Sequence, residues 1–177
     1  MKKTLTFVGY VILLLVALFG LVQVVLGGNI DPDDKWAWGT NVGWINFAPS
    51  CDGCGGVTVY GDHLEGYAWG ENIGWIRLGS HEGGGAHTYA NTSATDYGVN
   101  MSPDGTLSGY AWSPTVGWIN FAPNGGGVTI NTATGEFAGF AWGENIGWIR
   151  FKGTAADLTR YRLIARLYHV YLPLVRK

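Results

Sequence analysis

Apolar and polar residues alternate in short stretches along most of this chain, which is typical of β-strands with two different faces. Residues 67–69 alternate, a loop bounded by glycines follows at 70–74, and residues 75–78 alternate again. Two alternating stretches around a short glycine loop predict a β-hairpin. Similar stretches recur at 36–47, 110–121 and 140–151. The loops also contain asparagines that we expect to be turn formers with positive φ, namely Asn41, Asn72 and Asn145. The pattern therefore predicts four hairpins of one design.

Each predicted hairpin has an aromatic face and an aliphatic face. In the second hairpin we expect Trp69 to pair with Trp75 across the strands. Tyr67 then lies opposite Arg77 on the same face, because side chains alternate along a strand. The other face of this hairpin carries Ala68, Ile76 and Leu78. Both faces are too apolar for full solvation, so we expect both to be covered, as in a sandwich or a stack of repeats.

The four hairpins form two pairs. Copies one and three share Gly-Trp-Ile-Asn-Phe-Ala-Pro, and copies two and four share Gly-Glu-Asn-Ile-Gly-Trp-Ile-Arg. A duplicated pair predicts an approximate two-fold axis. We expect leading strands at 57–60, 99–101 and 128–130, with none before the first copy. The repeats predict an all-β domain of about 10–12 short antiparallel strands, arranged as a sandwich, a barrel or a propeller.

The N-terminus is predicted to lie outside this domain. Two lysines precede an uncharged apolar run from Leu5 to about Gly27. A bilayer span needs about 20 residues, whereas the core of a secretory signal has about 7–15. We expect residues 1–28 to form an uncleaved transmembrane helix, with a cleaved signal as the alternative. The lysines would stay in the cytoplasm, so residues 29–35 are predicted to be a linker and residues 36–153 a periplasmic or extracellular domain.

The C-terminal segment, residues 154–177, is basic and contains no glycine. Helix-forming residue types dominate it, and Pro173 would end a helix. Apolar residues cover most of a helical projection, so we expect an amphipathic helix that docks to a partner protein or to lipid headgroups. The residues expected to make these contacts are Tyr161, Arg162, Ile164, Arg166, Tyr168 and Tyr171.

The aromatic face, with its Arg or Asn, is the candidate binding feature that recurs in every copy. In the favoured interpretation it forms a buried tryptophan ladder with arginines stacked on the rings. In the alternative, exposed rings and polar side chains form a carbohydrate-binding platform. The platform residues would be Tyr67, Trp69, Trp75, Arg77, Phe140, Trp142, Trp148 and Arg150.

Cys51 and Cys54 are the only cysteines of the chain. Outside the cytoplasm this close spacing favours a disulfide that closes a loop. A structural zinc site needs about four ligands, and His63, His81 and His87 are scattered through the sequence. His81 and His87 lie in an insertion at 79–96, rich in Gly, Ser and Thr, which predicts a surface loop with solvated histidines. We therefore expect no metal site.

The charge of the chain and the absence of known motifs argue against nucleic-acid binding and against enzymatic activity. The net charge of −2 and the 14% of charged residues give no reason to expect nucleic acid as a partner. The chain contains no phosphate-binding loop, and no nucleophile–base pair or paired carboxylates in a defined setting. We therefore expect no enzymatic activity and no cofactor.

All nine tryptophans lie in the four motifs. The Gly-Tyr-Ala-Trp…Asn-Ile-Gly-Trp-Ile pattern, present with variations at 66–76, 109–119 and 139–149, resembles tandem repeats of bacterial secreted and surface-anchored proteins. That family has no assigned activity. The resemblance covers roughly Trp36 to Phe151 and implies a cell-envelope setting without indicating a particular site.

These expectations favour one function. We expect a non-catalytic, membrane-anchored accessory subunit, which contacts the lipid bilayer and the other protein subunits of a membrane or surface assembly. One alternative is a carbohydrate-binding module that uses its Trp and Tyr rings. The other is a self-associating filament or sheet subunit, because a first copy without a leading strand would leave an open strand edge.

Overall fold

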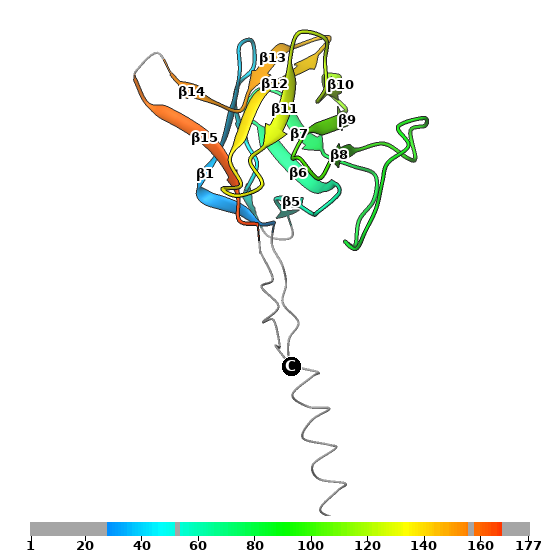
Figure 1. Cartoon of the computed structure of the whole chain (residues 1–177). Coiled ribbons are helices and arrows are strands. Elements are labelled where there is room, and N and C mark those ends of the chain that lie inside the picture. The colour runs from blue at the N-terminus through cyan, green and yellow to red at the C-terminus, as the bar shows by residue number, and fades with distance from the viewer. Residues whose placement is uncertain (1–27, 52–53, 156–157, 168–177) are drawn as a thin grey trace, which may run out of the picture.

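The computed structural model describes residues 28–51, 54–155 and 158–167. The regular elements among these residues are β-strands (Figure 1), so the predicted all-β class is confirmed. None of the described residues forms a helix that could cross a membrane. The expected transmembrane anchor, residues 1–28, falls almost wholly outside the described residues.

Eight strands form a closed antiparallel barrel. Each barrel strand pairs with the next one along the chain. The last strand then pairs with the first, with Trp38 opposite Arg150, and this pairing closes the ring. The barrel strands are β1 (Ile30–Gly39), β2 (Gly43–Asn46), β6 (Leu64–Gly70), β7 (Gly74–Arg77), β9 (Leu107–Ser113), β10 (Gly117–Asn120), β12 (Phe137–Gly143) and β13 (Gly147–Arg150). Of the three predicted arrangements, the structure has the barrel.

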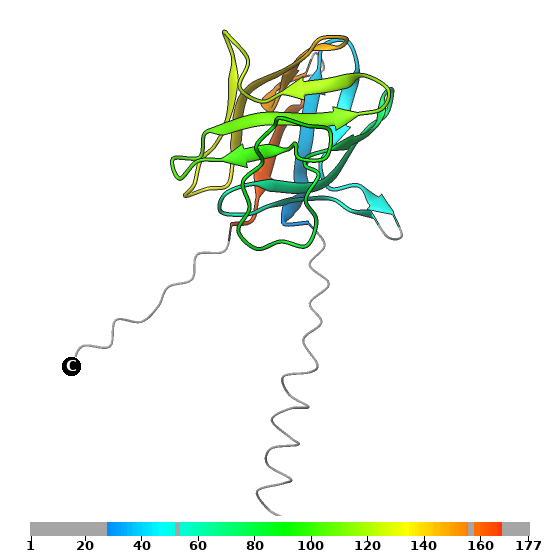
Figure 2. The ribbon, with the colours of Figure 1, turned by 90° about the vertical axis from the view of Figure 1, so that its right-hand side faces the viewer.

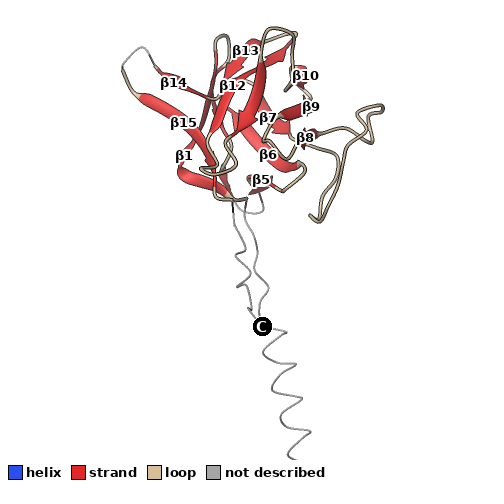
Figure 3. Ribbon diagram, in the orientation of Figure 1, coloured by secondary structure: helices blue, strands red, loops and turns tan. Residues whose placement is uncertain are grey.

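The four predicted hairpins supply the barrel strands in chain order (Figure 3). In the second hairpin Trp69 lies opposite Trp75, as predicted. The turn closes through the Ile73 amide, which donates to the Gly70 carbonyl at 3.2 Å. Gly74 follows with a φ of 73°, a left-handed conformation that glycine adopts without strain. Because the hairpins follow one another round the barrel, copies one and three lie on opposite sides, as an approximate two-fold axis requires.

The long strand of each hairpin changes partner part-way along. In the last three hairpins its first half pairs with a leading strand, which is β5 (Val57–Val59), β8 (Val99–Met101) or β11 (Gly127–Ile130). Its second half pairs within the hairpin. The change in β6 occurs at Gly66, where φ is 87° and a Cβ would lie 2.2 Å from the Gly56 carbonyl oxygen. A side chain at this position would therefore separate β6 from its leading strand.

The C-terminal part of the chain provides the leading strand of the first copy. β15 (Arg160–Ala165) pairs antiparallel with β1, with Ile30 opposite Ala165 and Lys35 opposite Leu163. A short strand, β14 (Lys152–Thr154), pairs with the other edge of β15. The open edge expected beside the first copy is therefore covered by the chain itself. β1 also begins inside residues 29–35, the stretch expected to be a linker.

The expected C-terminal amphipathic helix is wrong for the described part of residues 154–177. Tyr161, Leu163 and Ala165 are buried, whereas Arg160, Arg162 and Arg166 are exposed. This period of two is that of a strand with one core face. Helix propensities are weak, and pairing with β1 together with burial of the apolar face outweighs them. Tyr168 and Tyr171 lie outside the described residues.

The barrel interior contains the aliphatic faces of the hairpins and a group of phenylalanines. The inward residues of the second hairpin, Ala68 and Ile76, are buried, as predicted, and so are their equivalents Ala37, Ile45, Ala111, Ile119, Ala141 and Ile149. Phe151 packs against Phe47, Phe121 and Phe137, with ring centroids 5.7–5.8 Å apart. A closed barrel buries only its inner face. The expectation that both hairpin faces are covered is therefore wrong.

The loop asparagines do not have the positive φ expected of them. Among the described non-glycine residues, positive φ occurs at Asn91 and Leu158. Instead, three side-chain amides donate to carbonyls of the preceding loop round the barrel: Asn72 to Val42 at 3.0 Å, Asn145 to Val116 at 3.0 Å and Asn41 to Ile146 at 3.1 Å. The third loop has Thr115 at the equivalent position and so has no amide for this bond.

We expect Asn145→Ala to lower the free energy of unfolding by about 1 kcal/mol, the usual net contribution of one hydrogen bond. Thr115→Asn should raise this free energy by up to about 1 kcal/mol, because by analogy with the other three loops we expect its amide to donate to the Ile73 carbonyl of the preceding loop. Urea denaturation of the full chain, followed by circular dichroism, measures both changes. Equal destabilisation by the two substitutions would contradict the role assigned to the loop amides.

Candidate functional site

The aromatic faces of the four hairpins point away from the barrel axis and form a belt around it. The aromatic belt consists of Trp36, Trp38, Trp44, Tyr67, Trp69, Trp75, Tyr110, Trp112, Trp118, Phe140, Trp142 and Trp148. In each hairpin two paired indoles meet with ring centroids 4.6–4.8 Å apart. Six of the belt side chains are 36–41% exposed: Trp69, Trp75, Tyr110, Trp118, Phe140 and Trp148. The favoured interpretation of a buried tryptophan ladder is therefore wrong for these rings.

The arginines of the belt make the cation–π contacts expected of them. The guanidinium of Arg77 lies 5.8 Å from the centre of the Tyr67 ring, and that of Arg150 lies 5.7 Å from the centre of the Phe140 ring. Arg77 also donates to Glu82 at 2.6 Å and to the Ser80 carbonyl at 3.0 Å. Each arginine thus lies over a ring of its own hairpin, which is half-buried Tyr67 for Arg77 and exposed Phe140 for Arg150.

A groove of about 800 Å³ runs between the third and fourth hairpins and the insertion. One side consists of belt rings, which are Tyr110, Trp112, Trp118 and Trp142. The polar lining residues of the groove are Asn91, Thr92 and Ser93 of the insertion, and Asn120, Glu144 and Asn145 of the third and fourth hairpins, where Asn120 lies between Tyr110 and Trp142. Tyr97, which directly follows the insertion, packs against Trp118 with ring centroids 4.9 Å apart. The groove thus presents aromatic surface and hydrogen-bonding groups to the same ligand.

A second groove, of about 590 Å³, lies between the fourth and first hairpins. It is lined by the predicted platform residues Phe140, Trp148 and Arg150, together with Trp38, Trp44 and Tyr161. Of the other platform residues, Trp142 lines the first groove, and Tyr67 and Arg77 both contact Glu82 of the insertion. The predicted platform is therefore divided between different sides of the barrel.

The residues predicted to dock a partner through a helix have other contacts. Tyr161 packs edge-on against Trp44, with ring centroids 5.2 Å apart. Arg162 pairs with Asp34 at 2.8 Å, and Arg166 pairs with Asp31 at 3.0 Å. Ile164 is half-buried beside Glu136. These side chains hold β15 to the barrel.

The predicted disulfide lies at a tight turn. Cys51 ends β3 (Ser50–Cys51), Cys54 begins β4 (Cys54–Gly55), and the backbone pairing puts them opposite one another. The two intervening residues and both cysteine side chains fall outside what the structure describes. The disulfide therefore stays a prediction.

The insertion lies on the side of the barrel that faces the viewer in Figure 2, where its Gly83 and Gly84 amides donate to Glu65 of β6. Three histidine rings come together there. His63 directly precedes β6 and is fully buried. Its ring lies 5.8 Å from that of His81 and 5.6 Å from that of His87, and His81 and His87 stack at 4.2 Å. The ring of Tyr60 stacks on the ring of His63, with ring centroids 4.8 Å apart. The expectation of solvated histidines is therefore wrong.

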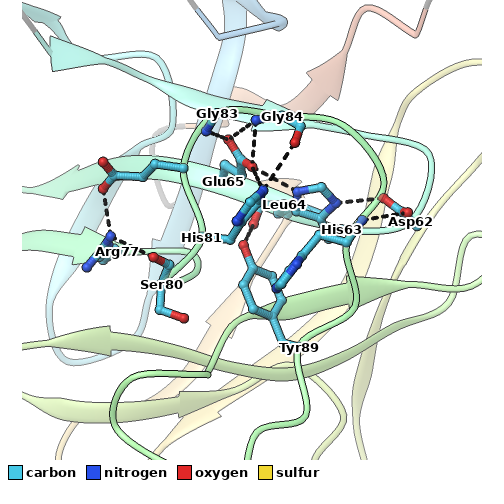
Figure 4. Close-up of polar contacts among 12 residues, drawn as sticks. Asp62, His63, Leu64, Glu65, Arg77, Ser80, His81, Gly83, Gly84 and Tyr89 are labelled. Atoms are coloured by element: carbon cyan, nitrogen blue, oxygen red, sulfur yellow. Dashed lines mark hydrogen bonds and ion pairs between the residues drawn. The ribbon is translucent and has the colours of Figure 1, made fainter.

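Two carboxylates flank the His63 ring (Figure 4). Asp62 Oδ1 lies 2.6 Å from Nδ1, and Glu65 Oε1 lies 3.0 Å from Nε2. Burial alone would raise the pKa of Glu65, but hydrogen bonds from His63 and from the amides of Gly84 and Gly83 outweigh burial and lower it. Burial would also raise the pKa of Asp62. Hydrogen bonds from His63 and from the His87 amide outweigh burial and lower this pKa. Both carboxyl groups are therefore ionised at neutral pH.

Sequence reasoning missed this histidine cluster because its parts are distant along the chain. His63 and Glu65 alternate with the buried Leu64, so they share one face of β6. His81 comes next to them because the insertion is bonded to this part of the barrel, where Glu65 accepts hydrogen bonds from backbone amides of the insertion at 3.1–3.3 Å. One signal was present, since three of the four histidines of the chain lie between residues 63 and 87.

Comparison of the chain with family models, with curated proteins and with solved structures found no match. The resemblance to bacterial surface repeats therefore stays a prediction, and the function has to be argued from the site itself.

Proposed function

We propose that this chain is a non-catalytic binding module that recognises carbohydrate through its aromatic belt, on the outer side of a membrane to which its N-terminal segment anchors it. The observation that carries the proposal is the 36–41% exposure of six belt rings, two of which, Tyr110 and Trp118, line a groove together with polar side chains. A core that needed these rings only for stability would bury them, because burial of an aromatic side chain is strongly favourable.

The groove between the third and fourth hairpins is the primary site in this proposal. Its volume of about 800 Å³ lies in the range of small-molecule sites, which is about 300–1,000 Å³. Sugar rings have an apolar C–H face that stacks on an indole, such as that of Trp118, and hydroxyl groups that need hydrogen-bonding partners. Asn120, Asn145 and Ser93 place such partners along the same groove.

Protein docking is the second candidate, and a specific observation favours it. Exposed rings continue onto the second hairpin, where Trp69 and Trp75 are both 37% exposed and do not line the groove. Tryptophan and tyrosine are enriched at protein interfaces. In this case the belt would hold another subunit of a membrane or surface assembly, and the chain would be an accessory subunit.

Titration calorimetry with soluble oligosaccharides of different monosaccharides tests the carbohydrate proposal. Among the oligosaccharides that bind the full chain, Trp118→Ala should lower the affinity by about tenfold or more, which corresponds to about 1.4 kcal/mol. The matched control is Trp75→Ala, which removes an equally exposed indole outside the groove and should leave the affinity unchanged. Absence of binding to every oligosaccharide, or equal losses from both substitutions, would overturn the proposal.

Co-purification from detergent-solubilised membranes distinguishes the second candidate. If the belt docks a protein, Trp75→Ala should release a stoichiometric partner that the unmodified chain retains. Release of that partner without any oligosaccharide binding would favour the accessory-subunit function over the carbohydrate-binding one.

A further inference from the structure

We propose that His63, Glu65 and His81 form a binding site for one divalent transition-metal ion of the zinc type, which fastens the insertion to the barrel. The nitrogen or oxygen ligand atoms of these three residues all lie within 4.8 Å of one another. The site is independent of carbohydrate binding, because none of its three residues lines the aromatic groove.

The distances suit an ion between the three side chains. Zinc binds imidazole nitrogen and carboxylate oxygen at about 2.0–2.2 Å, so the ligand atoms of a tetrahedral site lie roughly 3.3 Å apart. His63 Nε2 lies 3.0 Å from Glu65 Oε1, and His81 Nε2 lies 3.6 Å from the same oxygen. The two imidazole nitrogens lie within 4.8 Å of each other. His81 is half-buried on the insertion, where its Nε2 also lies 3.1 Å from the Gly84 carbonyl, so metal binding requires a shift of this side chain toward His63.

The contacts of His63 with two carboxylates are compatible with a cation on Nε2. A neutral imidazole has one N–H and can donate to only one of its two carboxylate neighbours, and in one of its two tautomers the short contact to Asp62 at 2.6 Å uses this N–H on Nδ1. The lone pair on Nε2 then faces a carboxylate oxygen of Glu65 at 3.0 Å, in a fully buried ring. A metal ion bound to both atoms removes this repulsion. A second proton on the ring would also remove it, and the experiment below separates the two.

Asp62 and the Gly83 amide are placed to orient the proposed metal ligands through hydrogen bonds. A carboxylate that accepts from the far nitrogen of a histidine ligand fixes the orientation of the ring, an arrangement common around zinc. Asp62 stands in this relation to His63, and the Gly83 amide donates to Glu65 Oε2 at 3.2 Å. The carboxylate of Glu65 is thus oriented with Oε1 toward both imidazoles.

The candidate ligands occur in only one of the repeats. The third copy has Thr106 and Ser108 where the second has His63 and Glu65, and the fourth copy has Glu136 and Ala138. These copies build the same strands without such a pair. The barrel itself therefore does not require the histidine and the glutamate, and the insertion that supplies His81 belongs to the same copy.

Zinc titration of the full chain, first freed of metal with a chelator, tests the proposal. We expect one Zn²⁺ per chain by calorimetry and a raised melting temperature, because an ion that binds only the folded state stabilises it. His81→Ala changes a half-buried residue of the insertion and should leave the barrel folded while lowering the affinity by about 100-fold or more, beyond the roughly 10–100-fold expected for the supporting Asp62→Asn. The matched control Glu82→Gln, on the same insertion, should bind as the unmodified chain does.

Cobalt(II) substitution supplies a second readout that does not depend on the variants. The expected spectrum is that of a tetrahedral or five-coordinate ion with nitrogen and oxygen ligands, without thiolate charge-transfer absorption. Thiolate absorption would assign the metal to Cys51 and Cys54 and overturn the proposal. Absence of binding at micromolar Zn²⁺, or an affinity unchanged in His81→Ala, would also overturn it.

Discussion

Phe151→Ala should lower the free energy of unfolding by about 3–5 kcal/mol, the usual cost of removing a buried phenylalanine ring. Phe151 is fully buried and packs against Phe47, Phe121 and Phe137. Because domains are stabilised by only about 5–15 kcal/mol, this single substitution should remove a large share of the total. Urea denaturation of the full chain measures the change.

The matched control for this prediction is Phe140→Ala. Phe140 lies on β12, and its ring points outward and is 40% exposed, whereas Phe151 is buried. Its removal should change the free energy of unfolding by less than about 1 kcal/mol. If both substitutions cost the same, the division into an inner core and an outer belt is wrong.

Leu163→Asp should destabilise the barrel more than Phe151→Ala does, or prevent it from folding. Leu163 is fully buried on the core face of β15, opposite Lys35 of β1. The substitution both removes apolar contacts and puts a carboxylate without a partner in the core, and each change is costly. The expected loss exceeds the roughly 2–5 kcal/mol of a leucine-to-alanine change, measured by urea denaturation or by the yield of folded protein.

Arg160→Asp on the same strand is the control for Leu163→Asp. Arg160 is exposed, and surface substitutions usually change stability by less than about 0.5 kcal/mol. In a helix, residues 160 and 163 would lie on the same side, so the two substitutions should then have similar effects. A large difference supports the strand, and equal effects would contradict it.

The hairpins could be predicted in detail because their signals are local. Alternation and the glycine loops predicted that Trp69 pairs with Trp75. The same alternation places Ala68 and Ile76 on one face of the hairpin, which is the buried one, and the aromatic rings on the other. The sequence could not decide whether a second layer covers the rings. That depends on closure between β1 and β13, a contact between residues more than one hundred positions apart.

The missed features share this dependence on distant contacts. β15 has the alternation of a strand, but its residue types also suit a helix, and only the unpaired edge of β1 decides between them. The histidine cluster likewise needs the insertion to fold back onto β6, where Glu65 accepts hydrogen bonds from Gly83 and Gly84. No periodicity in the sequence signals such a contact.

Two arginines of the C-terminal segment, which were predicted to contact a partner or lipid headgroups, form ion pairs within the domain instead. Arg162 and Arg166 pair with Asp34 and Asp31 of β1, which are exposed pairs of small individual value. Their effect is to favour the register in which Leu163 enters the core. The basic residues predicted to contact lipid headgroups are thus engaged within the domain at these two positions.

Acrylamide quenching of tryptophan fluorescence, with and without a bound oligosaccharide, tests the central claim most directly. The account predicts emission typical of solvent-exposed indoles, strong quenching by acrylamide, and protection by the oligosaccharide that is lost in Trp118→Ala. Blue-shifted emission that acrylamide does not quench would show that the rings are buried, and would contradict a binding surface made of the aromatic belt.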